Sequence, residues 1–179
     1  NNENSDSGVV LTNNIQVRNT PKNIFISKKV VGGTNELEGA LITITRTDDD
    51  ETPAWRDGVT SLKRNSNDMT GTVIEGNVID ENTSITKGQY VVTANSKTIG
   101  FYSDGNYATE IKNLLSGTYE LKEVVAPDGY RVLTTTFKFT VSDDGKITNV
   151  ENEDTDHYNL TETTITMSDD IKSTTISKV

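Results

Sequence analysis

The feature that most constrains the fold is a strand-like run, residues 119–130, that carries a carboxyl on its apolar side. Side chains of a strand alternate between two faces, so Tyr119, Leu121 and Glu123 share one face. The Pro-Asp-Gly sequence at 127–129 then predicts the end of the strand and a turn. A carboxyl on an apolar row costs free energy unless it is paired or takes part in chemistry. We therefore expect Glu123 to have a buried partner.

The remainder of the chain predicts an all-β domain. Short β-branched runs are separated by Gly, Asn and Asp, and the best stretch of helical period, residues 107–115, is barely two turns long. Turn residues predict two hairpins, at 98–111 and 134–150. The polar stretch at about 48–97 is too long for a plain loop, so we expect an insertion that builds a small subsheet.

Charge and composition exclude several classes of function. A formal net charge of −10 argues against nucleic acid and anionic membrane surfaces as partners, because both require basic patches. The absence of Cys excludes disulfides, thiolate metal sites and thiol nucleophiles. There is no signal peptide and no apolar run long enough to cross a bilayer, and the abrupt ends lead us to expect a piece of a longer protein. We expect neither a metal nor another cofactor.

The two ends of the chain resemble each other. Residues 15–22 match residues 165–172, and residues 26–28 match residues 176–178, at a constant offset of 150. We interpret residues 1–23 as the end of a preceding repeat with its linker, 24–171 as one complete domain, and 172–179 as the start of a following repeat. The alternative is a chance likeness between short strands rich in Thr, Ile and Lys.

Three polar side chains lie on apolar rows of different strands: Lys28, Glu123 and Asp169. In a sandwich the first and last strands are commonly neighbours, so the three side chains can meet in a dry core. Burial favours the uncharged forms of an amine and of a carboxyl. A neutral Lys28 amine could then attack the Asp169 carboxyl while protonated Glu123 assists, which would produce an amide. The alternative is a buried Lys–Glu–Asp salt-bridge cluster without a covalent bond.

Several motifs are similar to those of one family. They are Ile-Ser-Lys at 26–28, Leu-Glu-Gly-Ala at 37–40, Asn-Leu at 113–114, Gly-Thr-Tyr at 117–119, and above all Leu-Lys-Glu at 121–123 followed by Ala-Pro-Asp-Gly-Tyr at 126–130. In these the chain resembles the collagen-adhesin B-type (Cna B-type, or SpaA-like pilin) domain, which also builds the sortase-assembled pilins of Gram-positive bacteria. The resemblance covers about residues 24–170 without the insertion.

The resemblance implies an Ig-like, transthyretin-like Greek-key β-sandwich with a spontaneous intramolecular isopeptide bond. By position, Lys28 corresponds to the lysine of the family, Glu123 to the catalytic glutamate, and Asp169 to the acceptor. Asp170 is an adjacent alternative acceptor, since the Asn-x-Pro character usual there is absent. That character is present in the preceding-unit element that begins at Asn19.

These observations predict a structural repeat of a bacterial cell-surface adhesin or pilus-like stalk, extracellular and attached to the cell wall or a pilus. Expected partners are adjacent repeats or subunits of the same fibre and a host matrix protein. Asn19 and Lys178 are candidates for crosslinks to neighbouring units. An alternative is a ligand-binding module that recognises its ligand through residues 48–97. The chain offers no second reactive cluster, so we do not expect a turnover enzyme.

Four other features have an ordinary interpretation beside a functional one. The acidic run at 48–51 could ligate Ca²⁺, but its spacing fits no known loop, so we expect a solvated acidic loop. We expect Trp55 to be a packing anchor rather than a ligand-binding aromatic. His157, the only His, is expected at the surface. Lys22 is expected in a linker rather than in a sortase motif.

Overall fold

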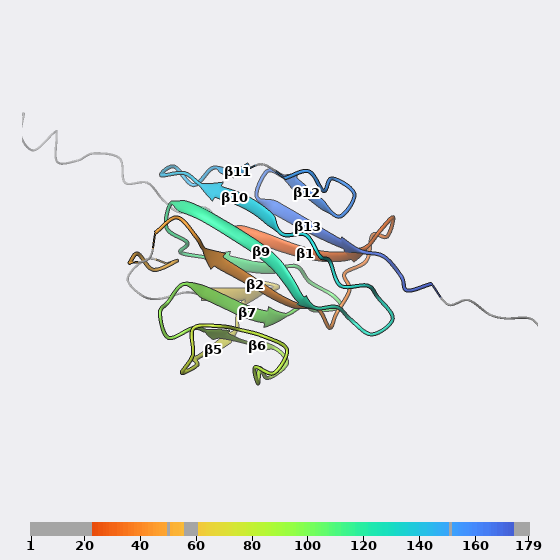
Figure 1. Cartoon of the computed structure of the whole chain (residues 1–179), viewed down its shortest axis with the longest axis horizontal. Coiled ribbons are helices and arrows are strands. Elements are labelled where there is room, and N and C mark those ends of the chain that lie inside the picture. Colours follow the sequence, from red (N-terminus) through yellow and green to blue (C-terminus); the bar gives the residue numbers. More distant parts are fainter. Residues whose placement is uncertain (1–22, 50, 56–60, 151, 174–179) are drawn as a thin grey trace, which may run out of the picture.

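The structure, a computed structural model, describes residues 23–49, 51–55, 61–150 and 152–173, and within these residues it contains thirteen strands and no helix (Figure 1). The strands are β1 (Ile24–Val30), β2 (Leu41–Arg46), β3 (Ser61–Arg64), β4 (Asn67–Asp68), β5 (Thr70–Val73), β6 (Gln89–Val92), β7 (Thr98–Tyr102), β8 (Thr109–Lys112), β9 (Gly117–Val125), β10 (Phe137–Val141), β11 (Ile147–Asn149), β12 (Tyr158–Thr161) and β13 (Thr164–Asp169).

The strands form two mixed sheets that pack face to face. The six-stranded sheet has the order β12-β13-β1-β8-β3-β4, and the seven-stranded sheet has the order β11-β10-β9-β2-β7-β6-β5. In Figure 1 the seven-stranded sheet lies in front, with β11 near the top and β5 near the bottom. The all-β sandwich expected from the sequence is confirmed.

The core between the sheets is filled by the alternate side chains of both. Ile24 and Ile26 of β1 and Tyr119 and Leu121 of β9 belong to this core, and all four are at most 2% exposed. Aromatic rings run through this layer: the ring of Tyr119 stacks on Phe139, Phe139 on Phe137, and Phe137 on Tyr158, with centroids 5.5, 6.2 and 5.5 Å apart. The apolar row that ends in Glu123 therefore lies inside the core, as the alternation predicted.

The first and last strands of the domain are neighbours, and they run parallel. β1 pairs with β13 in a register that places Lys28 opposite Met167 and Val30 opposite Asp169. β1 is bounded on its other side by β8. The pairing places residues separated by most of the chain in one hydrogen-bonded ladder.

One of the two predicted hairpins is wrong. β10 and β11 form the expected antiparallel pair, but β7 belongs to the seven-stranded sheet and β8 to the six-stranded sheet. The Asp104 carboxylate accepts hydrogen bonds from the amides of Asn106 and Tyr107, at 2.9 and 3.0 Å, and the chain passes from one sheet to the other here. Such a turn is common to hairpins and to sheet crossings, so the turn residues alone could not distinguish them.

The insertion does not form a sheet of its own. Its strands β3 and β4 extend the six-stranded sheet through β8, and β5 and β6 extend the seven-stranded sheet through β7. Leu62, Tyr90 and Val92 from these strands join the common core. Ile79, in the loop between β5 and β6, packs with Leu41 and Val91 in a smaller apolar cluster. One strand of the insertion in each sheet, β3 or β6, buries apolar side chains that would otherwise face water, whereas the residues of β4 and β5 are exposed.

Candidate functional site

The three polar side chains predicted to converge do meet inside the sandwich. Lys28 of β1, Glu123 of β9 and Asp169 of β13 are each at most 1% exposed. The Lys28 Nζ atom lies 3.0 Å from Glu123 Oε2 and is in direct contact with Asp169 Oδ1. Lys28 and Asp169 come from one sheet and Glu123 comes from the other, so the cluster joins the two layers.

The strand register explains this convergence. Because Lys28 lies opposite Met167, Asp169 is two residues further along β13, on the same face and diagonal to the lysine. On β9, Glu123 is paired with Ile42, and the next pair along is Leu41 with Val125, so one extra residue is accommodated directly after the glutamate. Such bulges bend a strand and re-aim its side chains, and they are frequent beside reactive sites.

The cluster is short of hydrogen bonds. The amide of Leu133 donates to Glu123 Oε1 at 2.9 Å. Within the described part of the chain, no hydrogen bond of ordinary geometry reaches Glu123 Oε2, Lys28 Nζ or either carboxyl oxygen of Asp169. Buried polar atoms without such bonds carry a desolvation cost, and they are frequent where chemistry takes place.

Burial changes the ionisation of the glutamate. It raises the pKa of Glu123 from 4.5 to about 7, and the nearby Lys28 amine and the Leu133 amide oppose the rise only in part. The Glu123 carboxyl can therefore hold or release a proton near neutral pH. That is the property required of a group that both donates a proton and accepts one.

The site is covered by the chain that follows β9, which we call the closing segment (residues 127–133). Its turn places Gly129 at φ +88°, a conformation that favours glycine, and the amide of Tyr130 donates to Pro127 O at 3.1 Å. Tyr130 then forms an antiparallel bridge with Ile171, just beyond β13. The segment ends at Leu133, which is 7% exposed and packs into the core.

The side chain of Tyr158 lies close enough to the site to sense the charges of Glu123 and Asp169. The Tyr158 hydroxyl donates to Thr135 O at 2.7 Å. Burial raises the pKa of Tyr158, and the Glu123 carboxyl adds to the rise. The three side chains of the cluster are at most 1% exposed, and exclusion of water strengthens every electrostatic interaction among them.

The two adjacent aspartates have different environments. Asp169 is fully buried against Lys28, whereas the Asp170 side chain is 50% exposed and lies 2.7 Å from His157 Nε2. His157 lies at the surface, as expected, with 25% of its side chain exposed, but its pairing with two aspartates was not expected. Its other ring nitrogen, Nδ1, lies 2.9 Å from Asp154 Oδ1. Nothing in the sequence pattern indicated this arrangement, because Asp170 lies beyond β13, in a different part of the chain from the loop that holds Asp154 and His157.

The acidic run and Trp55 both have contacts that account for them structurally. In the acidic run, Asp48 is paired with Arg46 at 2.7 Å and Asp49 with Lys97 at 3.5 Å. No group of three or more potential metal ligands is found among the residues that the structure describes. Trp55 is 1% exposed within the main core, as expected for a packing anchor.

The predicted residues near the two ends cannot be placed. Asn19, Lys22 and Lys178 lie outside the described residues. Within the described residues there is no helix long and apolar enough to span a membrane.

The ligand-binding alternative stays a prediction. A shallow hollow of about 320 Å³ lies where the insertion meets the main sandwich, lined in part by Glu38, Ile85, Lys87 and Tyr102. Lys87 and Glu38 pair across it at 2.7 Å and are both largely exposed. An exposed ion pair of this kind carries no specificity for a ligand by itself.

Comparison with known proteins gives a family and several structural neighbours. The family model of the SpaA domain, described as a prealbumin-like fold domain, matches residues 22–156, a range that contains Lys28 and Glu123 and ends before Asp169. The comparison with curated proteins returned no match.

Among solved structures, the pilus adhesin RrgA from Streptococcus pneumoniae is 18% identical over 87% of this chain and 16% of its own, with a TM-score of 0.44. The pilus-presented adhesin Cpa is 18% identical over 73% of this chain and 26% of its own, with a TM-score of 0.40. A C-terminal fragment of the pilus adhesin SpaC from Lactobacillus rhamnosus GG is 14% identical over 88% of this chain and all of its own, with a TM-score of 0.34.

This chain thus spans 26% or less of the length of the first two adhesins, and all three similarities are distant. The family match is stronger evidence, because it extends over most of the chain and includes the strands that carry Lys28 and Glu123. The resemblance expected from the sequence motifs is therefore confirmed, and this chain belongs to the SpaA family of prealbumin-like fold domains.

Proposed function

We propose that this chain is a structural unit of a bacterial cell-surface adhesin or pilus-like fibre, stabilised by a spontaneous amide bond between Lys28 and Asp169. The observation that carries the proposal is the direct contact of the Lys28 amine with the Asp169 carboxyl in a site that is at most 1% exposed. The SpaA family match and its pilin-like motifs support the setting. The unit works outside the cell, and its partners are neighbouring units of the same fibre.

In the proposed reaction, proton transfer from the Lys28 ammonium to Glu123 leaves a neutral amine beside the Asp169 carboxyl. The Nζ lone pair attacks Asp169 Cγ, while protonated Glu123 donates a hydrogen bond to a carboxyl oxygen. Glu123 passes its proton to that oxygen, then takes a second proton from the nitrogen and delivers it to the same oxygen, which departs as water. A bond forms between Nζ and Cγ, a bond between Cγ and one Oδ breaks, and one water is released.

Proximity accounts for the rate without a separate enzyme. The two reacting groups are held in contact by the β1–β13 ladder, so the reaction is unimolecular and entropy has already been lost in folding. Water is kept out by the closing segment, so hydrolysis does not reverse the bond. Each chain reacts once, and the product stays in the core. The chain is a self-crosslinking structural protein and not a turnover enzyme.

The bond has a thermodynamic and a mechanical consequence. It closes a loop of about 140 residues, which by the entropy model for crosslinks stabilises the fold by about 4–5 kcal/mol. Because β1 and β13 are neighbours near the two ends of the domain, the bond also lets force pass from one end to the other without unfolding the residues between them.

The intact mass of the purified chain tests the bond. We expect wild type to be lighter than its sequence by one water, and Glu123→Ala to have the full mass, because the proton carrier is missing. Glu120→Ala is the matched control, since Glu120 is on the same strand and on the opposite face, and it should still lose water. A wild-type chain of full mass would overturn the proposal and leave a buried salt-bridge cluster.

The mass also identifies the acceptor. Asp169→Asn would release ammonia instead of water and give the same amide, so its crosslinked mass should equal that of crosslinked wild type. Asp170→Asn should stay crosslinked but differ from wild type by the mass difference between an amide and an acid. The reverse result would assign the bond to Asp170.

Single-molecule stretching from the two ends tests the mechanical role. Glu123→Ala should show an unfolding step that includes the residues between β1 and β13, with a gain in contour length of about 460–500 Å for that stretch. Wild type should lack this gain. An equal gain in contour length in both chains would contradict a crosslink that carries the applied force.

A further inference from the structure

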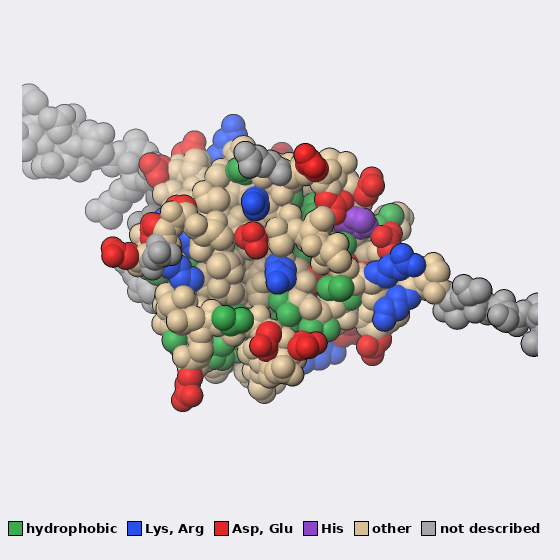
Figure 2. Space-filling view, in the orientation of Figure 1, with side chains coloured by type: hydrophobic (Ala, Val, Ile, Leu, Met, Phe, Trp, Pro, Cys, Tyr) green, Lys and Arg blue, Asp and Glu red, His purple; other side chains and the backbone are tan. Residues whose placement is uncertain are grey.

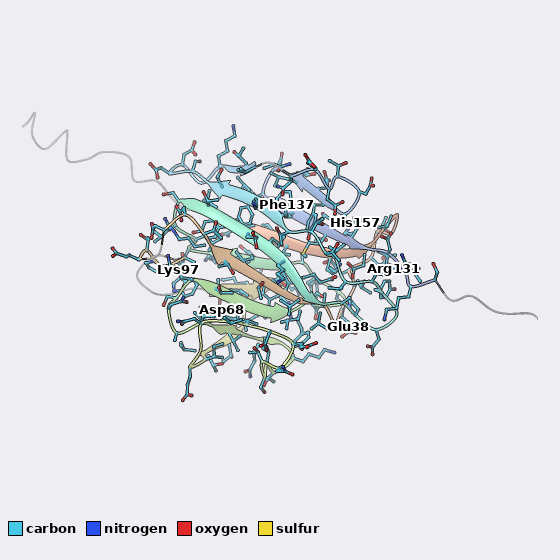
Figure 3. All side chains as sticks on the ribbon, in the orientation of Figure 1. Glu38, Asp68, Lys97, Arg131, Phe137 and His157 are labelled. Carbon is cyan, nitrogen blue, oxygen red and sulfur yellow. The ribbon has the colours of Figure 1, made fainter. Side chains whose placement is uncertain are left out.

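A second cluster of titratable side chains lies at the same end of the sandwich, outside the crosslink site. His157 sits between Asp154 and Asp170, and we call these three residues the histidine bracket. His157 Nδ1 lies 2.9 and 3.0 Å from the two Asp154 oxygens, and Nε2 lies 2.7 Å from Asp170 Oδ2. Figure 3 labels His157 and Arg131 at the end where β13 stops, and Figure 2 shows acidic side chains around the histidine.

The geometry requires a charged imidazole. An ionised carboxylate only accepts hydrogen bonds, so contacts on both ring nitrogens are satisfied only when both carry a proton. The Asp170 side chain, and next to it Asp154, raise the pKa of His157, against a smaller lowering by partial burial. These two aspartates are the charged groups that act on the ring within the described structure. The remaining neighbour of the bracket, Thr135, donates its hydroxyl to Asp154.

Backbone contacts connect the bracket to the crosslink site. The Ser168 amide of β13 donates to His157 O at 2.8 Å, and the Arg131 amide of the closing segment donates to Asp170 O at 2.9 Å. Two residues further along that segment, the Leu133 amide donates to Glu123 Oε1. The bracket therefore holds both the end of β13, which carries the acceptor, and the segment that orients the proton carrier.

We propose that His157 is a positioning residue for the Lys28–Asp169 crosslink: by holding Asp154 and Asp170 together, it fixes the closing segment over the site. This inference rests on the proposed function. The bracket touches none of the reacting atoms, so it changes how often the three groups are correctly placed and not what they do. The neutral imidazole has a single N–H, so at high pH one of the two contacts sets a ring lone pair against a carboxylate, and the bracket loosens.

The rate of crosslink formation in newly made chains tests the proposal. Cell-free synthesis of the whole chain, stopped at successive times and followed by intact mass, gives the rate of water loss for wild type and for His157→Gln. Comparison at about pH 6 and about pH 9 separates the bracket from the chemistry, since the His157 ring is charged at the first pH and loses its charge as the pH rises toward the second. Both chains share Lys28 and Glu123, so their titration cancels in the ratio of rates.

We expect wild type to react about threefold faster than His157→Gln at the lower pH, as for a partly exposed charged contact, and at nearly the same rate at the higher pH. Asp170→Asn, which removes the carboxylate facing Nε2, should behave like His157→Gln. Both variants should reach the same final extent of crosslinking as wild type. Asp128→Asn is the charge-matched control in the closing segment and should react like wild type at both pH values.

The outcomes separate this inference from the proposed function. If no chain loses water, the crosslink itself is wrong. If wild type and His157→Gln crosslink at equal rates at both pH values, the crosslink stands and the positioning role is wrong. A ratio that stays constant between the two pH values would also overturn it, because general destabilisation by the substitution would slow the reaction without regard to the charge of His157.

Discussion

Two of the clusters in the described part of the chain pair a lysine with carboxylates, and these two differ in access to solvent. In the crosslink site, Lys28, Glu123 and Asp169 are all buried. In the other cluster, which we call the Lys97 cluster, the side chains of Arg46 and Lys97 are also nearly buried. The side chains of their partners, Asp48 and Asp49, are 31% and 44% exposed. Figure 3 shows Lys97 at the end of the sandwich away from His157 and Arg131.

The carboxyl pKa values in the two clusters are shifted in opposite directions. Hydrogen bonds from the Thr52 amide, at 2.6 Å, and from the Glu51 amide, at 2.9 Å, lower the pKa of Asp49 well below its usual value. Burial raises the pKa of Glu123 to about 7. A carboxylate that reaches solvent and two amide donors thus has a lowered pKa, whereas a carboxyl that is buried and receives a single amide hydrogen bond has a raised one.

The largest expected difference concerns removal of each lysine. Lys28→Met should lower the free energy of unfolding by about 5 kcal/mol or more, because the crosslink is lost and two carboxyls remain in a dry core. Lys97→Met is the matched control at the other cluster. Urea unfolding of both variants and of wild type measures the difference. Equal losses would mean that burial does not distinguish the clusters.

The next effect is the pH dependence of Lys28→Met. Without the amine, burial still holds the pKa of Glu123 in the folded state above its unfolded value of 4.5. At any pH between the unfolded and the folded pKa, the folded state therefore binds more protons than the unfolded state. Stability therefore falls as the pH rises from about 5 to about 8, on the order of 1 kcal/mol or more.

Lys28→Met combined with Glu123→Gln supplies the control, because it lacks the titrating carboxyl and should lose this slope. A single variant whose stability rises over the same pH range would contradict the assigned ionisation of Glu123.

The smallest effect is expected at the exposed cluster. The lowered pKa of Asp49 depends mainly on backbone donors and only slightly on Lys97, so Lys97→Met should leave most of it in place. The contribution of Asp49 is present above its unfolded pKa and is lost as the pH falls into the acid range. The difference between Lys97→Met and wild type should shrink with added salt, since exposed pairs are screened. A salt-independent loss as large as that of Lys28→Met would remove the contrast between the clusters.

The residues of the candidate site could be found from the sequence because strands alternate strictly. Glu123 continues the row of Tyr119 and Leu121, and Lys28 and Asp169 continue similar rows on their own strands. Any charged residue on such a row is conspicuous, and the structure brings these three together. Sequence reasoning failed where one local signal serves two geometries. Residues 103–106 turn the chain whether it returns in the same sheet or crosses to the other.

The contacts of His157, unlike its surface position, were not foreseen. A lone histidine in a polar connection has no periodic partner, and its contacts come from Asp154 in its own loop and from Asp170 beyond β13. The strands of the insertion were likewise foreseen in part, but their division between two sheets depends on which apolar surface was left uncovered.

By itself, the sequence determined which side chains face inward, because the two-residue period of a strand is a local property of the backbone. It thereby determined the all-β class and the three polar residues committed to the core. Only the tertiary structure decided that β1 and β13 run side by side and that Asp169, and not Asp170, contacts Lys28. Pairing between distant strands and exclusion of water are properties of the assembled sandwich, and no local pattern encodes them.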